Sequence, residues 1–168
     1  YNVRSRYIFA FTRIRTHLIN IKKGVNVECD ERILMSSICV FCSSSNSIDD
    51  IYVETATDLG HRIGQLGLDL VYGGASIGLM GAVARATHEK GGRVVGVIPE
   101  FFRKKNKNIE YVEADELIVA ETMRIRKAIM DERADAFVVL PGGVGTLEEA
   151  IEIISMKQLG LTDKPLAF

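Results

Sequence analysis

Residues 136–149 of the chain read A-F-V-V-L-P-G-G-V-G-T-L-E-E. The apolar, β-branched run from Ala136 to Leu140 is typical of a buried strand, and Pro141 ends it. Three glycines in four positions follow, and an apolar-periodic helix is predicted from Thr146. Glycine lets backbone N–H groups approach a ligand closely, and a helix N-terminus attracts negative charge. This strand, loop and helix therefore predict an anion site that suits a phosphate.

The same glycine loop differs from the common nucleotide motifs and also has a purely structural interpretation. It contains neither the dinucleotide pattern G-x-G-x-x-G nor the Gly-Lys-Ser/Thr of a P-loop. Thr146 and Glu149 stand three residues apart, as in a helix capping box. From this pattern alone, Glu149 is either a cap or a catalytic carboxylate.

The composition is that of an ordinary globular domain. The chain has 168 residues, of which 47% are hydrophobic and 26% charged, enough for one core. Its net charge of −1 excludes a strong field for nucleic acid or for a membrane surface. No apolar run approaches the roughly 20 residues of a membrane span. We therefore expect neither a nucleic-acid partner nor a membrane partner.

The cysteines indicate a reducing, cytoplasmic compartment. Cys29, Cys39 and Cys42 are too few for a disulfide scaffold. Cys39-x-x-Cys42 has the spacing of half a zinc site or of a redox pair, but no second pair follows. The sequence therefore predicts no metal site and no cofactor.

Residues 1–34 differ in charge from the rest. They carry seven basic and three acidic residues, a net of +4, whereas the remainder of the chain has a net of −5. We expect a basic extension that is not part of the core, with Met35 as the functional start and the catalytic domain at 35–168.

From Ser36 onward, short apolar runs alternate with helical patterns. Strands are predicted at 38–42, 68–72, 93–98, 117–120, 136–140 and from 165 onward. Helices are predicted at 50–66, from the glycine-rich turn 73–81 to residue 90, at 122–133 and at 146–160, and residues 101–115 are predicted to be a solvated loop. This alternation predicts a single-domain, doubly wound (Rossmann-like) α/β fold, a parallel sheet with helices on both faces. Ligands of such sheets bind beyond the carboxyl ends of the strands, where the predicted loops are 42–49, 73–81, 99–115 and 141–146.

Two cations belong to the helix predicted at 122–133. Met123 and Met130 fall on one line of the helical wheel, and Arg126 and Lys127 flank it within about 60°. Because a buried cation is costly unless it is paired, this arrangement predicts a carboxylate or phosphate partner. A surface pair whose stems lie over the methionines is the alternative.

The two motifs at this spacing resemble one known family. M-x-x-R-K-x-x-M at 123–130, followed by P-G-G-x-G-T-x-x-E at 141–149, is similar to the LOG family of cytokinin riboside 5′-monophosphate phosphoribohydrolases, long mislabelled as lysine decarboxylases. The loops C-S-S-S at 42–45 and G-G-A-S-I-G-L-M-G at 73–81 match as well. The resemblance implies a homodimeric hydrolase that splits the N-glycosidic bond of AMP or of an N6-modified AMP into free base and ribose 5-phosphate.

The resemblance also implies the residues of the site. Arg126 and Glu149 would be the catalytic pair, with Glu149 stabilising positive charge on the ribose and activating water. The nucleotide would be bound by Arg126 and by Ser76, Lys127, Gly142, Gly143, Val144, Gly145, Thr146, Leu147, Glu148 and Ser155.

The chain departs from the family pattern at three places. Ser43 stands where relatives usually have glycine, and a substrate-contacting Glu of the relatives falls near Asn108. The chain ends at Phe168, where relatives continue into a last helix, so we expect a C-terminally truncated domain.

Other functions are conceivable on the same fold. A non-catalytic nucleotide or cofactor carrier, resembling molybdenum-cofactor carrier proteins, would share the glycine loops but would not need Arg126 together with Glu149. A DNA-processing module of the DprA type is disfavoured by the acidic core.

Overall fold

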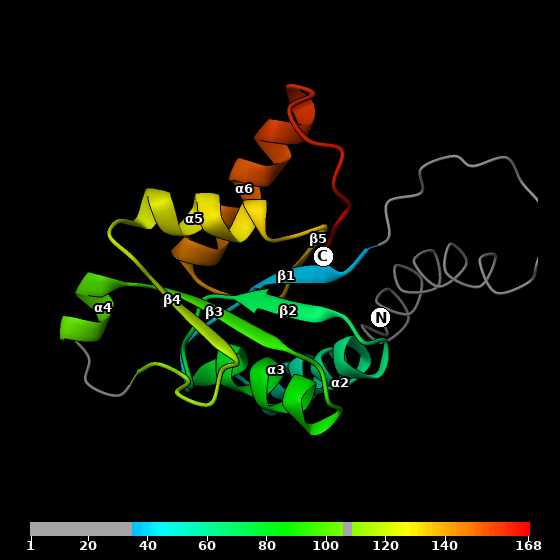
Figure 1. The fold of residues 1–168 in the computed structure, drawn as a ribbon, viewed down its shortest axis with the longest axis vertical. Helices are drawn as coiled ribbons and strands as arrows, with labels where there is room; N and C mark the ends of the chain where they lie inside the picture. Colours follow the sequence, from blue (N-terminus) through cyan, green and yellow to red (C-terminus); the bar gives the residue numbers. More distant parts are fainter. Residues whose placement is uncertain (1–34, 106–108) are drawn as a thin grey trace, which may run out of the picture. The chain divides into compact units, whose positions relative to one another are not determined.

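The strands of the sheet are formed by the apolar runs of the sequence. The computed structural model describes residues 35–105 and 109–168 (Figure 1), so the predictions for residues 1–34 and for Asn108 lie outside the described residues. The strands are β1 (Ser37–Phe41), β2 (Asp69–Tyr72), β3 (Val94–Pro99), β4 (Glu116–Ala120), β5 (Ala136–Val139) and β6 (Leu166–Ala167). They form a six-stranded sheet of order β4-β3-β2-β1-β5-β6, and the pairings among β1 to β5 are parallel. The predicted doubly wound α/β fold is confirmed.

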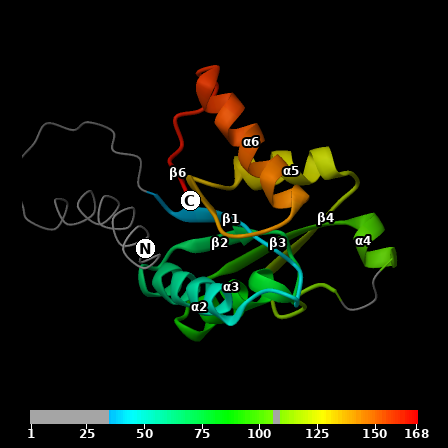
Figure 2. The same cartoon turned by 180° about the vertical axis from the view of Figure 1, so that it is seen from behind.

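Helices cover both faces of this sheet. Helices α2 (Asp50–Gln65) and α3 (Gly78–Glu89) lie on one face, and α5 (Met123–Glu132) and α6 (Val144–Gln158) lie on the other, as Figure 1 and the reverse view in Figure 2 show. Because both faces are covered, the strands are nearly continuous apolar runs rather than alternating ones. No helix within the described residues is long and apolar enough to cross a membrane.

The core beneath α5 and α6 is built from alternate residues of the strands. Cys39 and Phe41 of β1, Val71 of β2 and Phe137 of β5 belong to one buried hydrophobic cluster with Met130 of α5. The rings of Phe41 and Phe137 stack with centroids 5.6 Å apart. This packing fixes the end of β1, which leads into the first of the predicted ligand loops.

The loops after β1, β2 and β5 meet at the carboxyl edge of the sheet. Strand order reverses between β1 and β5, which is where doubly wound sheets bind their ligands. Ser43, after β1, donates from its backbone N–H to the carbonyl of Pro141 at 3.1 Å and accepts from the N–H of Met80 at 3.3 Å. The loop after β1 therefore joins the two glycine-rich loops into one edge.

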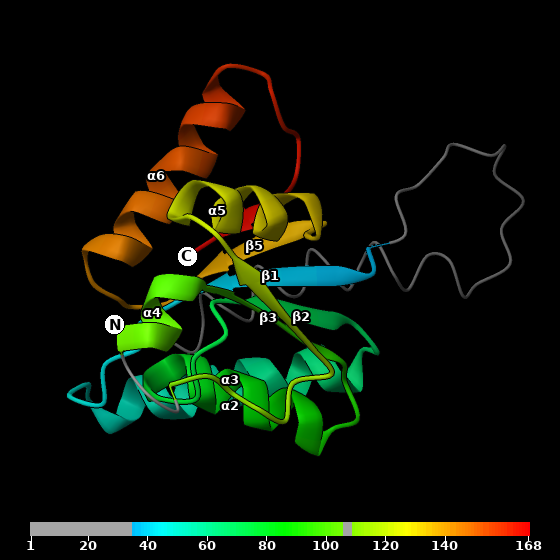
Figure 3. The same cartoon turned by 60° about the vertical axis from the view of Figure 1, so that its left-hand side comes forward.

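The segment after β3 differs from the prediction of a solvated loop. Residues Glu100–Lys105 form the short helix α4, seen clearly in Figure 3, in which Lys104 pairs with Glu100 one turn earlier at 2.9 Å. Farther on, Ala75 and Glu110 form an antiparallel bridge, and the N–H of Tyr111 donates to the carbonyl of Gly74 at 2.9 Å. Backbone pairing with the glycine-rich loop at 73–81 therefore orders Glu110 and Tyr111, which belong to a stretch without apolar periodicity.

Candidate active site

The glycine-rich loop after β5 is shorter than predicted, because α6 begins at Val144 instead of Thr146. Gly143 is the N-cap residue, and the first backbone hydrogen bond runs from the N–H of Leu147 to the carbonyl of Gly143 at 3.0 Å. The capping-box interpretation is wrong, since no side chain caps the helix at Gly143. The side chain of Thr146 instead lies against Gly142, where a Cβ would come within 2.1 Å of its hydroxyl oxygen. Only glycine fits at position 142.

The start of α6 is open on its outer side. A Cβ added to Gly143 or to Gly145 would meet no atom within 4 Å, and Val144 is 84% exposed. The backbone N–H groups of the first helical turn have no partner within the helix. Together these features form an exposed, partially positive helix end at the carboxyl edge of the sheet, which suits a phosphate.

Arg126 and Glu149 form a buried ion pair next to this helix end. Nη1 of Arg126 donates to Oε1 of Glu149 at 2.5 Å, and the two side chains are only 5% and 6% exposed. Nε of Arg126 also donates to the carbonyl of Val97, within β3, at 2.9 Å. Glu149 is therefore the partner of a buried cation and not a helix cap, and the surface alternative for Arg126 is wrong.

Gly73 makes room for the guanidinium. A Cβ at this position would lie 2.5 Å from Nη2 of Arg126 and 2.7 Å from the terminal methyl of Met80. Within the described residues, Nη2 has no hydrogen-bond acceptor, so it is available to a ligand that enters between the two glycine loops.

We expect Gly73→Ala to destabilise the fold, and Gly143→Ala to leave it almost unchanged. The alanine methyl at 73 must displace the guanidinium or the methionine, and overpacking of this kind costs about 1–3 kcal/mol. The methyl at 143 enters open space, where substitutions change stability by about 0.5 kcal/mol or less. Urea unfolding followed by circular dichroism measures both, and equal stabilities of the two variants would contradict the arrangement.

Lys127, the next residue of α5, connects α5 to α6 at the surface. Its Nζ lies 2.5 Å from Oε1 of Glu148 and 2.6 Å from Oε2 of Glu152. Burial lowers the pKa of Lys127, but the hydrogen bonds to these two carboxylates outweigh it and raise the pKa above its usual value. Lys127 therefore stays an ammonium ion across the physiological pH range.

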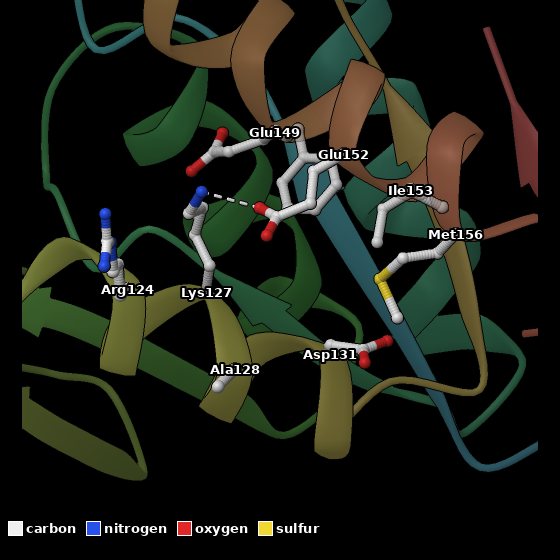
Figure 4. A pocket seen from close by; sticks show the side chains of 9 residues that line it. Arg124, Lys127, Ala128, Asp131, Glu149, Glu152, Ile153 and Met156 are labelled. Atoms are coloured by element: carbon white, nitrogen blue, oxygen red, sulfur yellow. Dashed lines mark ion pairs between the residues drawn. The ribbon is translucent and has the colours of Figure 1, made fainter. Parts of the chain in front are cut away.

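A pocket of about 210 Å³ lies between α5 and α6, with Glu149 in its wall (Figure 4). Nine residues line it: Phe41, Arg124, Lys127, Ala128, Asp131, Glu149, Glu152, Ile153 and Met156. In Figure 4 a dashed line joins Lys127 to Glu152, and Met156 and Asp131 lie to the right of this ion pair and below it. Glu149, the carboxylate of the motif at 141–149, thus borders a pocket between the two helices.

Of the predicted substrate-binding residues, only Lys127 lines this pocket. The backbone N–H and the hydroxyl of Ser76 both donate to the carbonyl of Ile109, at 2.8 and 3.1 Å. These bonds hold the glycine-rich loop at 73–81 against the chain at Ile109. Ser155 is exposed on α6 and does not line the pocket. Leu147 is 59% exposed and also lies outside the pocket wall.

The two cysteines of the Cys39-x-x-Cys42 motif are free, buried thiols beside the ion pair. Burial raises the pKa of Cys42 far above its usual value; the charge of Glu149 adds to this shift and that of Arg126 opposes it. Both thiols therefore stay protonated, which makes them poor metal ligands and poor nucleophiles. The described residues contain no cluster of three or more His, Cys, Asp or Glu side chains that could hold a metal ion.

Several contributors to the site were not predicted from the sequence, among them Gly73, Phe41 and Val97. Gly73 belongs to a turn already recognised as glycine-rich, so its small size was a visible signal. Phe41 was visible only as part of a strand. Val97 acts through its backbone carbonyl, which every residue type has, so the sequence gives no signal for this role.

Comparisons with known proteins give a consistent result. The family described as "Possible lysine decarboxylase" matches residues 80–168, more than half of the chain. The chain is 45% identical over 142 residues to cytokinin riboside 5′-monophosphate phosphoribohydrolase LOG4 of Arabidopsis thaliana, a match covering 84% of this chain and 65% of that protein. It is 44% identical over 137 residues to the LOG enzyme of Oryza sativa subsp. japonica, covering 82% of this chain and 56% of the rice protein.

A solved structure gives the same fold. The Moco carrier protein of Chlamydomonas reinhardtii aligns with a TM-score of 0.64 at 24% identity, covering 79% of this chain and 74% of that one. At this identity the likeness concerns the fold alone. The chain spans somewhat less than two thirds of the length of the curated relatives. The family match and these relatives show that the chain belongs to the LOG family.

Proposed function

We propose that this chain carries the active site of a nucleoside 5′-monophosphate phosphoribohydrolase. The enzyme would hydrolyse the N-glycosidic bond of AMP or of an N6-modified AMP, releasing free base and ribose 5-phosphate. The observation that carries the proposal is the buried pair of Arg126 and Glu149 one helical turn from the open start of α6. The names of the Arabidopsis and rice relatives support the same reaction.

The phosphate would bind at residues 142–146. The unpaired N–H groups of the first turn and the helix dipole favour a dianion there, and the absence of side chains at Gly143 and Gly145 lets it approach the backbone. Phosphate binding far from the bond that breaks helps to position the ribose without itself being altered in the reaction.

Glu149 would act on the ribose carbon that bears the base. When the bond to the base lengthens, positive charge develops on that carbon and on the ring oxygen, and a nearby carboxylate stabilises it. Glu149 then accepts a proton from water as the water oxygen bonds to the same carbon, and the departing base takes up a proton. Arg126 positions the carboxylate through Nη1 and offers Nη2 to the substrate.

The test is to incubate the full chain with AMP and with N6-isopentenyl-AMP and to quantify free base and ribose 5-phosphate by chromatography. Equal amounts of base and ribose 5-phosphate support the hydrolase. Binding of either nucleotide without release of base would instead favour the alternative, a nucleotide or cofactor carrier, which has no need of the buried pair.

We also propose that the protein is a homodimer. Support comes from α6, where Val144, Leu147, Ile151 and Ile154 form an apolar stripe with exposed fractions of 84%, 59%, 51% and 43%. The stripe starts at the proposed phosphate site, so a second copy packed on it would border the nucleotide. Sedimentation equilibrium of the full chain tests this, and a monomer at micromolar concentration would reject it.

A further inference from the structure

We propose that His88, at the far end of α3, is a positioning residue for the reaction at Arg126 and Glu149. This inference rests on the proposed function, because it takes that buried pair to act on the nucleotide. His88 lies in the last turn of α3, about 15 Å along the helix from Gly78, and outside every motif recognised in the sequence. It would act by holding residues 109–115 against the glycine-rich loop at 73–81.

His88 is bonded through both ring nitrogens to the segment that precedes β4. Nε2 lies 2.8 Å from Oδ2 of Asp115, and Nδ1 lies 3.0 Å from the hydroxyl oxygen of Tyr111. The same oxygen of Asp115 accepts the N–H of Val94, the first residue of β3, at 2.7 Å. That N–H and the bond from His88 hold the pKa of Asp115 below its usual value, so the carboxylate is an anion at neutral pH. His88 therefore ties both Tyr111 and Asp115 to the end of α3.

The bond between His88 and Tyr111 can form in both charge states of the imidazole. Because Nε2–H donates to the carboxylate, Nδ1 of the neutral ring accepts the hydroxyl proton of Tyr111. In the charged ring Nδ1–H donates to the tyrosine oxygen instead. Burial, and then the nearby carboxylate of Glu113, raise the pKa of Tyr111 to about 12, so the phenol keeps its proton. The contact is therefore kept when the imidazole gains or loses a proton.

Tyr111 is the anchor of a segment that is otherwise poorly packed. Of residues 109–115, only Tyr111 is buried, whereas Val112 is 79% exposed. The tyrosine ring lies beside the imidazole with centroids 5.5 Å apart, where the segment runs along α3 (Figure 3). A segment with so little apolar burial opens easily, so its position depends on the hydrogen bonds of Tyr111 and Asp115.

This segment is paired in turn with the glycine-rich loop at 73–81. The N–H of Tyr111 donates to the carbonyl of Gly74 at 2.9 Å, and the N–H of Ser76 donates to the carbonyl of Ile109 at 2.8 Å. The loop is therefore bonded on both sides of Ala75 to a segment that His88 holds.

The loop reaches the ion pair through Gly73, which directly precedes Gly74. A Cβ at Gly73 would lie 2.5 Å from Nη2 of Arg126, so the backbone there already lies close to the guanidinium. Any shift of this loop changes the space left to Nη2 and to the substrate group that it would meet. Misplacement of a catalytic group by about 1 Å can cost about 100-fold in rate. His88 thus acts on Arg126 through Tyr111 and the loop.

Tyr111→Phe and His88→Leu test this role, because each removes the bond between the two side chains and keeps apolar bulk. In the full chain, amide hydrogen exchange of Ser76 is measured by NMR, and kcat and KM are measured for base release from AMP. We expect exchange at Ser76 to be faster by about 5-fold or more and kcat to fall by about 10-fold. KM should stay within about threefold of the wild type, because the proposed phosphate site at 142–146 is untouched.

Two further variants separate positioning from a general loss of stability. His88→Asn places an amide oxygen near the position of Nδ1, where it can accept from Tyr111, and should restore about half of the wild-type kcat or more. His61→Leu removes a second histidine–carboxylate pair at α3, in which Nε2 of His61 lies 2.8 Å from Oε2 of Glu89. The side chain of His61 is 28% exposed and that of His88 25%, so the two sites are comparable. His61→Leu should change neither the exchange at Ser76 nor kcat.

The outcomes judge this inference and the proposed function separately. Unchanged exchange at Ser76 in both test variants, or faster exchange with wild-type kcat, overturns the positioning role. An equal fall of kcat in His61→Leu assigns the effect to stability and overturns it as well. If His88→Leu fails to fold, Tyr111→Phe, which lacks one oxygen atom, decides. A wild-type chain that releases no base rejects the hydrolase alone, and faster exchange in the test variants then still supports the hold of His88 on the loop.

Discussion

Replacing Glu149 by glutamine is expected to lower the rate of base release by about 1,000-fold or more while the chain stays folded. The amide keeps the volume of the side chain and can still accept a hydrogen bond from Nη1 of Arg126. It carries no negative charge and cannot take a proton from water. Loss of a positioned acid–base group alone typically costs about 10²–10⁴-fold, and here the stabilisation of the ribose cation is lost as well.

The neighbouring acid provides the comparison for this variant. Glu148 is 54% exposed and pairs with Lys127 at the surface, whereas Glu149 is 6% exposed and pairs with Arg126. Glu148→Gln is therefore expected to lose less than about 10-fold, since exposed ion pairs contribute little. Single-turnover base release with AMP measures both variants. A Glu149→Gln protein with near wild-type rates would remove Glu149 from the mechanism.

Arg126→Ala is expected to cost about 3–5 kcal/mol of stability as well as activity. The substitution leaves the carboxylate of Glu149 buried without a counter-charge, and breaking a buried pair from one side has costs of this size. It also removes the donor to the carbonyl of Val97. Urea unfolding followed by circular dichroism measures the loss, with exposed Arg124→Ala as the matched control, expected to stay within about 0.5 kcal/mol of the wild type.

A double variant shows whether the buried charge is the cause. Adding Glu149→Gln to Arg126→Ala neutralises the unpaired carboxylate, so part of the lost stability should return, with a coupling of about 0.5–3 kcal/mol. Strictly additive losses would mean that Arg126 stabilises the fold through packing and its bond to β3, and not through Glu149.

Much of the architecture could be predicted from the sequence because its signals are local. Apolar β-branched runs ending at Pro99 and Pro141 mark β3 and β5, and alternation with helical patterns implies a parallel sheet. The pairing of a cation at 126 with an acid could be inferred from its place beside the apolar line of Met130, since a buried cation needs a partner.

The rest could not be predicted because it depends on contacts distant in sequence or on backbone atoms. Helix α4 is only six residues long, has no buried residue, and so lacks an apolar period. Glycines indicate a loop, so the sequence predicts that α6 begins at Thr146, although the helix begins at Val144 and includes Gly145. The pocket needs Phe41 from β1 and Met156 from α6 to lie together, which only the finished sheet provides.

The open space around Gly143 and Gly145 at the start of α6 bears on why glycine occupies these positions. Glycine within a helix is less stable than alanine by roughly 0.5–1 kcal/mol, and the structure has room for a methyl group at Gly145. Gly145→Ala would therefore raise the free energy of unfolding. The phosphate proposed for this helix end gives a reason for glycine at position 145, because a methyl group would come between the anion and the backbone N–H groups.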